Sequence, residues 1–175
     1  MRNSILTPGI KKESLIMLVL LTGFAVIAPL IFRQQLITGT IVNATLITGV
    51  SLLGITNGIL IGLIPSAIAL STGIISPAMA PMIPFIVMGN AILVITFSYF
   101  SKFNYWLGAA AGSVLKFAFL YGMSNIVFNL IIEKKLGAAA AQTMSWPQLA
   151  TALAGSVIAY GVLRIIRAGD KAARK

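Results

Sequence analysis

Six apolar stretches fill almost the whole of this chain, and a single charged residue, Lys116, lies deep inside any of them. The hydrocarbon core of a bilayer is about 30 Å thick, and roughly 20 helical residues cross it. The stretches have about that length, and they cover residues 15–32, 36–54, 58–75, 81–100, 105–132 and 146–166. The sequence therefore predicts an all-α integral membrane protein, one membrane domain over residues 1–175 that folds as a compact bundle of six transmembrane helices.

The composition excludes several kinds of chemistry. Hydrophobic residues make up 58% of the chain and charged residues 9%, whereas soluble domains carry about 25% charged residues. There is no cysteine and no histidine, which removes thiolate nucleophiles, imidazole bases and most transition-metal sites. The acids Glu13, Glu133 and Asp170 each lie at or beyond the end of a span, so no two carboxylates are expected to meet in the membrane. We expect no enzyme, no cofactor and no metal site.

The basic residues predict the orientation of the bundle. Six spans place both termini on one side. If that side is the cytoplasm, the tails 1–14 and 167–175 together with Lys102 and Arg164 carry nine of the 13 basic residues. Because cytoplasmic loops hold the excess of Lys and Arg, we expect both termini in the cytoplasm. The net charge of +10 lies beside hydrophobic spans, which favours membrane lipid as a partner and argues against nucleic acid.

Glycines at a spacing of four residues indicate where helices pack closely. Gly54, Gly58 and Gly62 form one row, and Gly108 and Gly112 form another. Small residues let helices approach each other in a membrane, where no hydrophobic effect drives them together. We expect these faces to pack within the chain, and the alternative is that they bind a helix of a partner.

Side-chain amides are concentrated in the outer half of the predicted membrane domain or at its rim. Seven lie there: Gln34, Gln35, Asn43, Asn90, Asn125, Asn129 and Gln148. Unpaired amides are costly in hydrocarbon, so one explanation is a polar pocket, open to the outside, that captures a small polar solute. Tyr121 shares a helical stripe with Asn125 and Asn129, and we expect Tyr121 and Trp146 to contribute to the same binding region. The alternative is that the amides link helices, each bond contributing about 0.6–2 kcal/mol.

Lys116 is the second candidate for function. It follows Tyr105 by eleven residues, which places it about 16 Å along the helix and near the middle of the membrane. An ionisable residue inside a membrane is a functional-site hypothesis by default, and Lys116 would meet a carboxylate or phosphate of the solute. The alternatives are a deprotonated lysine, or one that bonds to carbonyls and extends toward the interface. Lys116 lies about half a turn away from the stripe of Asn125, so the two need not share a site.

Three segments resemble a known family of membrane proteins. They are Gly54-Ile-Thr-Asn-Gly58-Ile-Leu-Ile-Gly62, Pro81-Met-Ile-Pro84-Phe-Ile-Val-Met-Gly-Asn90 and Met144-Ser-Trp-Pro147-Gln. With the chain's size and its six spans, they resemble an S component, the substrate-binding membrane subunit of energy-coupling factor (ECF) vitamin transporters, in a subgroup with no assigned substrate. The resemblance covers about residues 15–167. The first span lacks the Ala-x-x-x-Ala spacing typical of the family.

The resemblance implies a function and a set of partners. An S component in the cytoplasmic (inner) membrane of a prokaryote captures a vitamin or similar micronutrient from outside, and a transmembrane coupling subunit with two ATPase subunits drives uptake. On this interpretation Asn90, Asn125, Asn129 and Gln148 contact the solute, Gln34 and Gln35 belong to the lid region, and Lys116 reaches the floor of the pocket. Two alternatives stay open, a membrane scaffold subunit without a small-molecule ligand and a solitary small-solute carrier.

Overall fold

The structure is a computed structural model that describes residues 12–32, 34–71, 77–131 and 141–173. Within those ranges the side chains of residues 69–71, 77–79, 128–131, 170 and 173 are not described. The long helices are α1 (Lys12–Ile31), α2 (Gln35–Leu53), α3 (Ile55–Ser71), α4 (Ile83–Phe100), α5 (Tyr105–Ile131) and α7 (Trp146–Ala173), and a 3-10 helix, η1 (Pro77–Met82), precedes α4. This part of the chain is all-helical, as the sequence predicts.

Five helices of the described part are long and apolar enough to cross a membrane. The helix α3 is apolar but shorter, at 17 residues, and the end of the predicted third span, residues 72–75, lies outside the described residues. The outer surface of α1 is covered by large apolar side chains, with Val19, Phe24 and Ile31 between 62% and 65% exposed. Soluble monomers rarely expose such a patch, and the hydrocarbon core of a bilayer would cover it. The described helices are those of a membrane-embedded protein.

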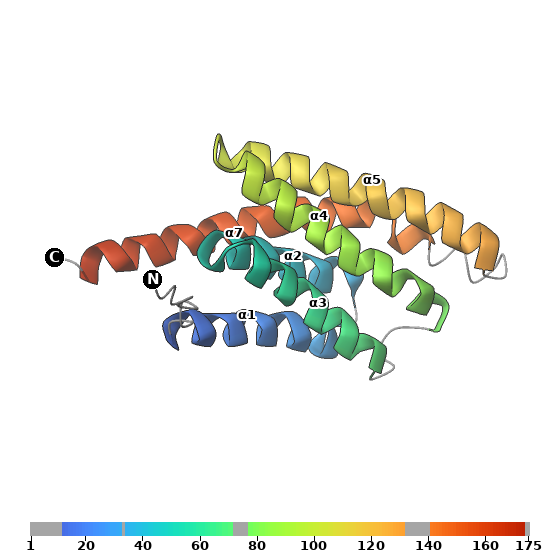
Figure 1. The fold of residues 1–175 in the computed structure, drawn as a ribbon, viewed down its shortest axis with the longest axis horizontal. Helices are drawn as coiled ribbons and strands as arrows, with labels where there is room; N and C mark the ends of the chain where they lie inside the picture. The colour runs from blue at the N-terminus through green and yellow to red at the C-terminus, as the bar shows by residue number, and fades with distance from the viewer. Residues whose placement is uncertain (1–11, 33, 72–76, 132–140, 174–175) are drawn as a thin grey trace, which may run out of the picture.

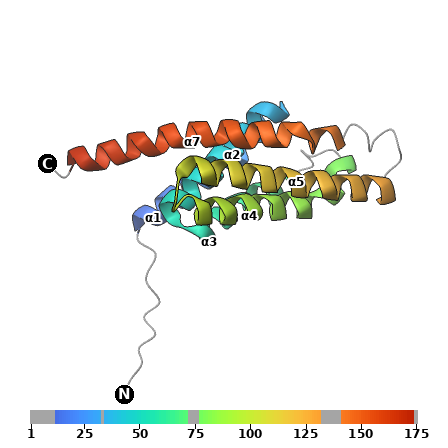
Figure 2. The same ribbon diagram turned by 90° about the horizontal axis from the view of Figure 1, so that it is seen from above.

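The helices run back and forth along one long axis (Figure 1). The start of α1, the α2–α3 turn, the α4–α5 turn and the end of α7 lie at the same end of the bundle in both views (Figures 1 and 2). We call this the termini end. The helix α2 is central, because it packs against α1, α3, α4 and α7. The helices α4 and α5 form an antiparallel pair that continues the bundle on one side.

The last helix is longer than predicted. The predicted span ends at residue 166, with a basic tail from 167, but α7 continues to Ala173 and projects beyond the other helices (Figures 1 and 2). The apolar length of a span predicts where it leaves the membrane, but a helix can continue in water if its residues have high helix propensity. The segment 167–173 is rich in alanine, arginine and lysine, all good helix formers. The basic Lys171 in the last turn also interacts favourably with the helix dipole.

Two apolar clusters of buried side chains lie along the bundle. The larger cluster, toward the termini end, is drawn from α1, α2, α3, α4, α5 and α7 and includes Leu46, Ile61, Leu93 and Phe97. The smaller cluster, toward the other end, joins Met82, Leu120, Val127 and Met144. Between the two clusters the helices carry a group of buried polar residues that form the candidate site: Asn43, Asn90, Ser113, Lys116 and Thr151.

The glycines at four-residue spacing pack against neighbouring helices of the same chain. A Cβ on Gly58 would lie 3.0 Å from side-chain carbons of Val50 and Val94, and one on Gly62 would lie 3.0 Å from Cβ of Asn90. In α5, Gly108 and Gly112 face the backbone of α4 in the same way. Gly54 has another role, since its φ of 85° lets the chain turn between α2 and α3.

Candidate functional site

Lys116 points into the bundle and is hydrogen-bonded to two asparagine side chains. Its Nζ atom donates to Oδ1 of Asn43 at 2.6 Å and to Oδ1 of Asn90 at 2.8 Å. The three residues come from α5, α2 and α4, and each is at most 4% exposed. The helical spacing explains the direction of the lysine, because Gly112, Ser113, Lys116 and Leu120 recur at three or four residues and share the buried face of α5.

Each asparagine amide bonds the lysine on one side and another helix on the other side. The Nδ2 atom of Asn43 donates to Oγ1 of Thr151 on α7, and that of Asn90 donates to the carbonyl oxygen of Gly62 on α3, both at 3.3 Å. Thr151 is 1% exposed, and its hydroxyl donates to the carbonyl oxygen of Gln148 at 3.2 Å. The network, which we call the lysine cluster (Lys116, Asn43, Asn90, Thr151 and the Gly62 carbonyl), therefore joins α2, α3, α4, α5 and α7.

Two glycines make room for the asparagines. A Cβ on Gly62 would lie 3.0 Å from Cβ of Asn90, and a Cβ on Gly155 would lie 2.7 Å from Cβ of Asn43. Any larger residue would push α3 away from α4 or α7 away from α2. The close approach of these helices brings the two amides within reach of one lysine.

No carboxylate contacts Lys116 among the residues that the structure describes. The chain has three acids; Glu13 lies at the exposed start of α1, and the side chains of Glu133 and Asp170 lie outside the described part. The asparagine oxygens supply dipoles but no negative charge. A lysine ammonium has three N–H donors, and two acceptors are present here in the described residues. The cluster can therefore offer a donor, and a positive charge, to an additional acceptor.

A buried hydroxyl lies one turn from the lysine on the same face of α5. Ser113 is fully buried, and its Oγ atom has no hydrogen-bond partner among the described residues. Buried polar groups are nearly always paired, with protein or with ordered water, so an unpaired one needs an explanation. Ser113 and Lys116 thus place a hydroxyl and an amine on the same buried face of α5.

The other predicted site residues lie apart from the lysine. Tyr121 and Asn125 are on the exposed face of α5, where Tyr121 stacks on Phe117 and the Nδ2 atom of Asn125 donates to the carbonyl oxygen of Tyr121 at 2.9 Å. The side chains of Tyr121 and Asn125 thus lie on a different face of α5 from Lys116. This agrees with the sequence analysis, which placed Lys116 about half a turn away from Asn125. Trp146 is 59% exposed at the start of α7. The side chain of Asn129 lies outside the described residues.

The remaining predicted amides lie toward the end of the bundle opposite the termini end. Gln34 and Gln35 are exposed at the start of α2. Gln148 is buried at the start of α7, where its Nε2 atom donates to the carbonyl oxygen of Thr143 at 3.2 Å. Its own carbonyl accepts the bond from Thr151, so Gln148 is connected to the lysine cluster through the backbone.

The sequence analysis missed Thr151 and Gly155. Gln148, Thr151 and Gly155 are separated by three and four residues, so they share one face of α7. A search for small and polar residues at this spacing would have identified the face that meets Asn43. Comparison of the chain with protein-family models, with curated proteins and with solved structures finds no match.

Proposed function

We propose that this chain is the substrate-binding membrane subunit of an ECF-type importer, an S component with both termini in the cytoplasm of a prokaryote. It captures a vitamin or a similar small micronutrient from the external face. A transmembrane coupling subunit and two ATPase subunits drive the uptake step, because this sequence has no phosphate-binding loop of the Walker type. The observation that supports the proposal most strongly is the lysine cluster, an ionisable group and two amides brought together from three helices of a membrane bundle.

The chemistry of the cluster favours a solute with an oxygen acceptor. An ionisable residue inside a membrane is costly, and such residues commonly mark pathways of solutes or ions. Lys116 has a donor in excess of its two amide acceptors, and Ser113 beside it has an unpaired hydroxyl. A carboxylate or phosphate oxygen of the solute would satisfy both groups, and a charge-assisted bond is about twice as strong as a neutral one. Gln34, Gln35 and Gln148 are proposed contacts nearer to the external face. The stripe of Asn125, which is exposed on α5 and lies about half a turn from Lys116, is not among the proposed contacts.

One observation favours a second function, a membrane scaffold without a small-molecule ligand. Asn43 and Asn90 each use both the oxygen and the nitrogen of the amide within the chain. A network whose amide groups are all used within the chain can have a purely structural role, which is to hold five helices together. The scaffold interpretation predicts that no metabolite accompanies the protein, and that variants of the lysine cluster change stability alone.

The two functions are separated by purification of the tagged full chain from its native membrane in a mild detergent. Mass spectrometry then identifies both the proteins and the small molecules that remain bound, with an unrelated tagged membrane protein as control. A coupling subunit with paired ATPases and a stoichiometric metabolite is the expected result. A metabolite without ATPases would indicate a solitary carrier, and the absence of both would favour the scaffold.

A further inference from the structure

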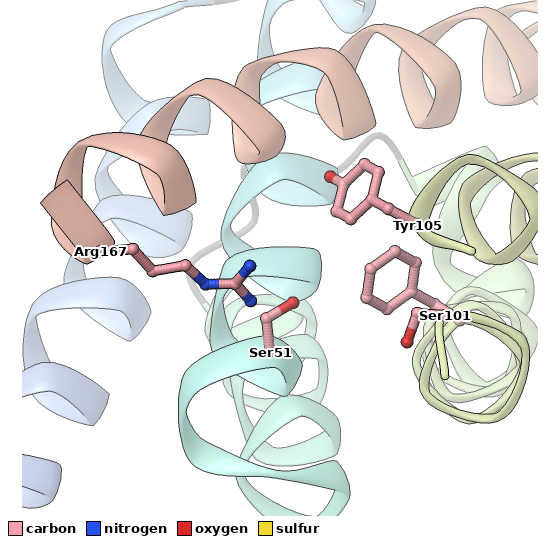
Figure 3. A pocket seen from close by; sticks show the side chains of 5 residues that line it. Ser51, Ser101, Tyr105 and Arg167 are labelled. Carbon is pink, nitrogen blue, oxygen red and sulfur yellow. The ribbon is translucent and has the colours of Figure 1, made fainter. Parts of the chain in front are cut away.

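A second polar site lies at the termini end of the bundle, far from the lysine cluster. A cavity of about 190 Å³ is lined by Ser51 at the end of α2, Phe97 and Ser101 at the end of α4, Tyr105 at the start of α5, and Arg167 on α7. Figure 3 shows the guanidinium of Arg167 reaching from α7 toward the hydroxyl of Ser51. Tyr105 precedes Lys116 by eleven residues on the same helix, which is about 16 Å. The two sites are therefore separate.

The depth of the cavity is indicated by an aromatic cluster beside it. The rings of Tyr105, Trp106 and Tyr160 lie 5.0–5.2 Å from one another, and the guanidinium of Arg164 lies 5.2 Å from the ring of Tyr160. Tyrosine and tryptophan are enriched where the bilayer core meets the headgroups. Arg167 is almost one turn beyond Arg164 toward the end of α7, so it lies at the level of the lipid headgroups.

The charge and the donors of the cavity suit an oxyanion. Arg167 has five N–H donors in a planar fork that fits a phosphate with two parallel bonds, and it has no hydrogen-bond or ion-pair partner among the described residues. The nearest acid in sequence is Asp170, whose side chain lies outside the described part. The hydroxyl of Ser101 donates to the carbonyl oxygen of Ser98 at 3.5 Å, a long bond that a better acceptor can replace.

Other lining groups limit what the cavity can hold. The hydroxyl of Tyr105 donates to the carbonyl oxygen of Ser156 at 2.6 Å, and that of Ser51 donates to the carbonyl oxygen of Ile47 at 2.7 Å. Tyr105, Ser51 and Phe97 therefore form walls and do not donate to a ligand. The volume of about 190 Å³ is below the roughly 300–1,000 Å³ of pockets that enclose a whole small molecule. The space fits a phosphate group whose remaining atoms stay outside.

We infer that this cavity binds the phosphate group of an anionic glycerophospholipid, with Arg167 as the charged ligand and the hydroxyl of Ser101 as an additional donor. The acyl chains of such a lipid stay in the bilayer beside the bundle. Basic pockets between transmembrane helices are a known way to recognise phospholipid headgroups. A bound headgroup would fill the space between α2, the α4–α5 turn and α7. The lysine cluster connects helices deeper in the bundle, so the two sites would stabilise different levels of it.

Native mass spectrometry of the full chain, purified in a neutral detergent and incubated with equal amounts of phosphatidylglycerol and phosphatidylcholine, tests the inference. The wild type is expected to retain phosphatidylglycerol preferentially. Arg167→Gln is expected to reduce this preference at least about tenfold. Lys171→Gln, which removes the same charge from the same helix but does not line the cavity, is expected to reduce it by about fivefold at most, as a general surface attraction would. Equal losses in the two variants would overturn the inference.

Two further measurements keep the test decisive. Arg167→Lys keeps the charge and loses the planar fork, so it is expected to reduce the preference for phosphatidylglycerol, and a preference equal to that of the wild type would contradict the site. Inorganic phosphate is added to lipid-free protein in the second measurement, and thermal unfolding is followed. If phosphate raises the unfolding temperature of the wild type but phosphatidylglycerol is not retained, the ligand is a free phosphate and the lipid assignment is wrong.

Discussion

The hydrogen bond between Lys116 and Asn90 predicts an energetic coupling that a double-mutant cycle measures. The variants are Asn90→Leu, Lys116→Met and the combination of both. The bond is 2.8 Å long and fully buried. Hydrogen bonds to charged groups contribute about 1.5–3 kcal/mol in soluble proteins, whereas side-chain bonds between membrane helices average about 0.6 kcal/mol and reach about 1.7 kcal/mol.

The expected coupling is at the upper end of the membrane range, about 1.5 kcal/mol. The reason is that Lys116 has two acceptors in the described part, so the loss of Asn90 leaves a buried amine with Asn43 alone. Asn90→Leu is therefore expected to lower the free energy of unfolding by about 2 kcal/mol in the wild type. In the Lys116→Met background the same change should cost much less, because no buried amine then depends on the asparagine.

The assay is reversible unfolding in mixed detergent micelles, followed by far-ultraviolet circular dichroism. Asn125→Leu is the matched control, because Asn125 is exposed and its amide bonds only within its own helix. The control is expected to change the free energy of unfolding by less than about 0.5 kcal/mol. A coupling below about 0.5 kcal/mol, the limit of additivity for independent sites, would refute the idea that the lysine and the asparagine act as a unit.

Three further changes test the packing of the bundle. Gly155→Ala is expected to destabilise the protein by about 1–3 kcal/mol in thermal unfolding, because the new Cβ would lie 2.8 Å from backbone atoms of α2. Gly161→Ala is the control and should not destabilise the protein, because a Cβ there would have no atom of a neighbouring element within 4 Å. Gly54→Ala is expected to lower the free energy of unfolding by about 1–3 kcal/mol in the same measurement, because φ is 85° and ψ is 176°. Tyr105→Phe removes the 2.6 Å bond to the carbonyl of Ser156 and should cost about 0.5–1.5 kcal/mol, and an unchanged stability would show that this bond contributes nothing.

The fold was largely predictable from the length of the apolar stretches. The bilayer permits few solutions for a chain that carries one charged residue inside its spans, so apolar length gave the helices with their approximate bounds. Apolar length could not predict where α7 ends, because its last residues are polar but still favour a helix. It also placed the start of the third span at residue 58, whereas α3 already begins at Ile55.

The composition of the lysine cluster was predictable only in part. The depth of Asn43, Asn90 and Lys116 followed from counting residues along each helix, and the separation of Asn125 followed from the half turn between it and Lys116. The contacts among the three residues depend on which helices are neighbours and how closely they approach. Gly62 and Gly155 set those distances. The spacing within one helix can identify the face on which each glycine lies, but it does not reveal which helix that face meets.

The most direct test of the proposed function is the mass-spectrometric comparison of small molecules retained by three forms of the purified protein. The forms are the wild type, the double variant Asn90→Leu/Lys116→Met and the control Asn125→Leu. If the lysine cluster binds the solute, the wild type and the control retain the same metabolite in stoichiometric amount, and the double variant, folded by circular dichroism, retains none. Equal retention by all three forms would contradict a solute site at Lys116, and no metabolite in any form would favour the scaffold.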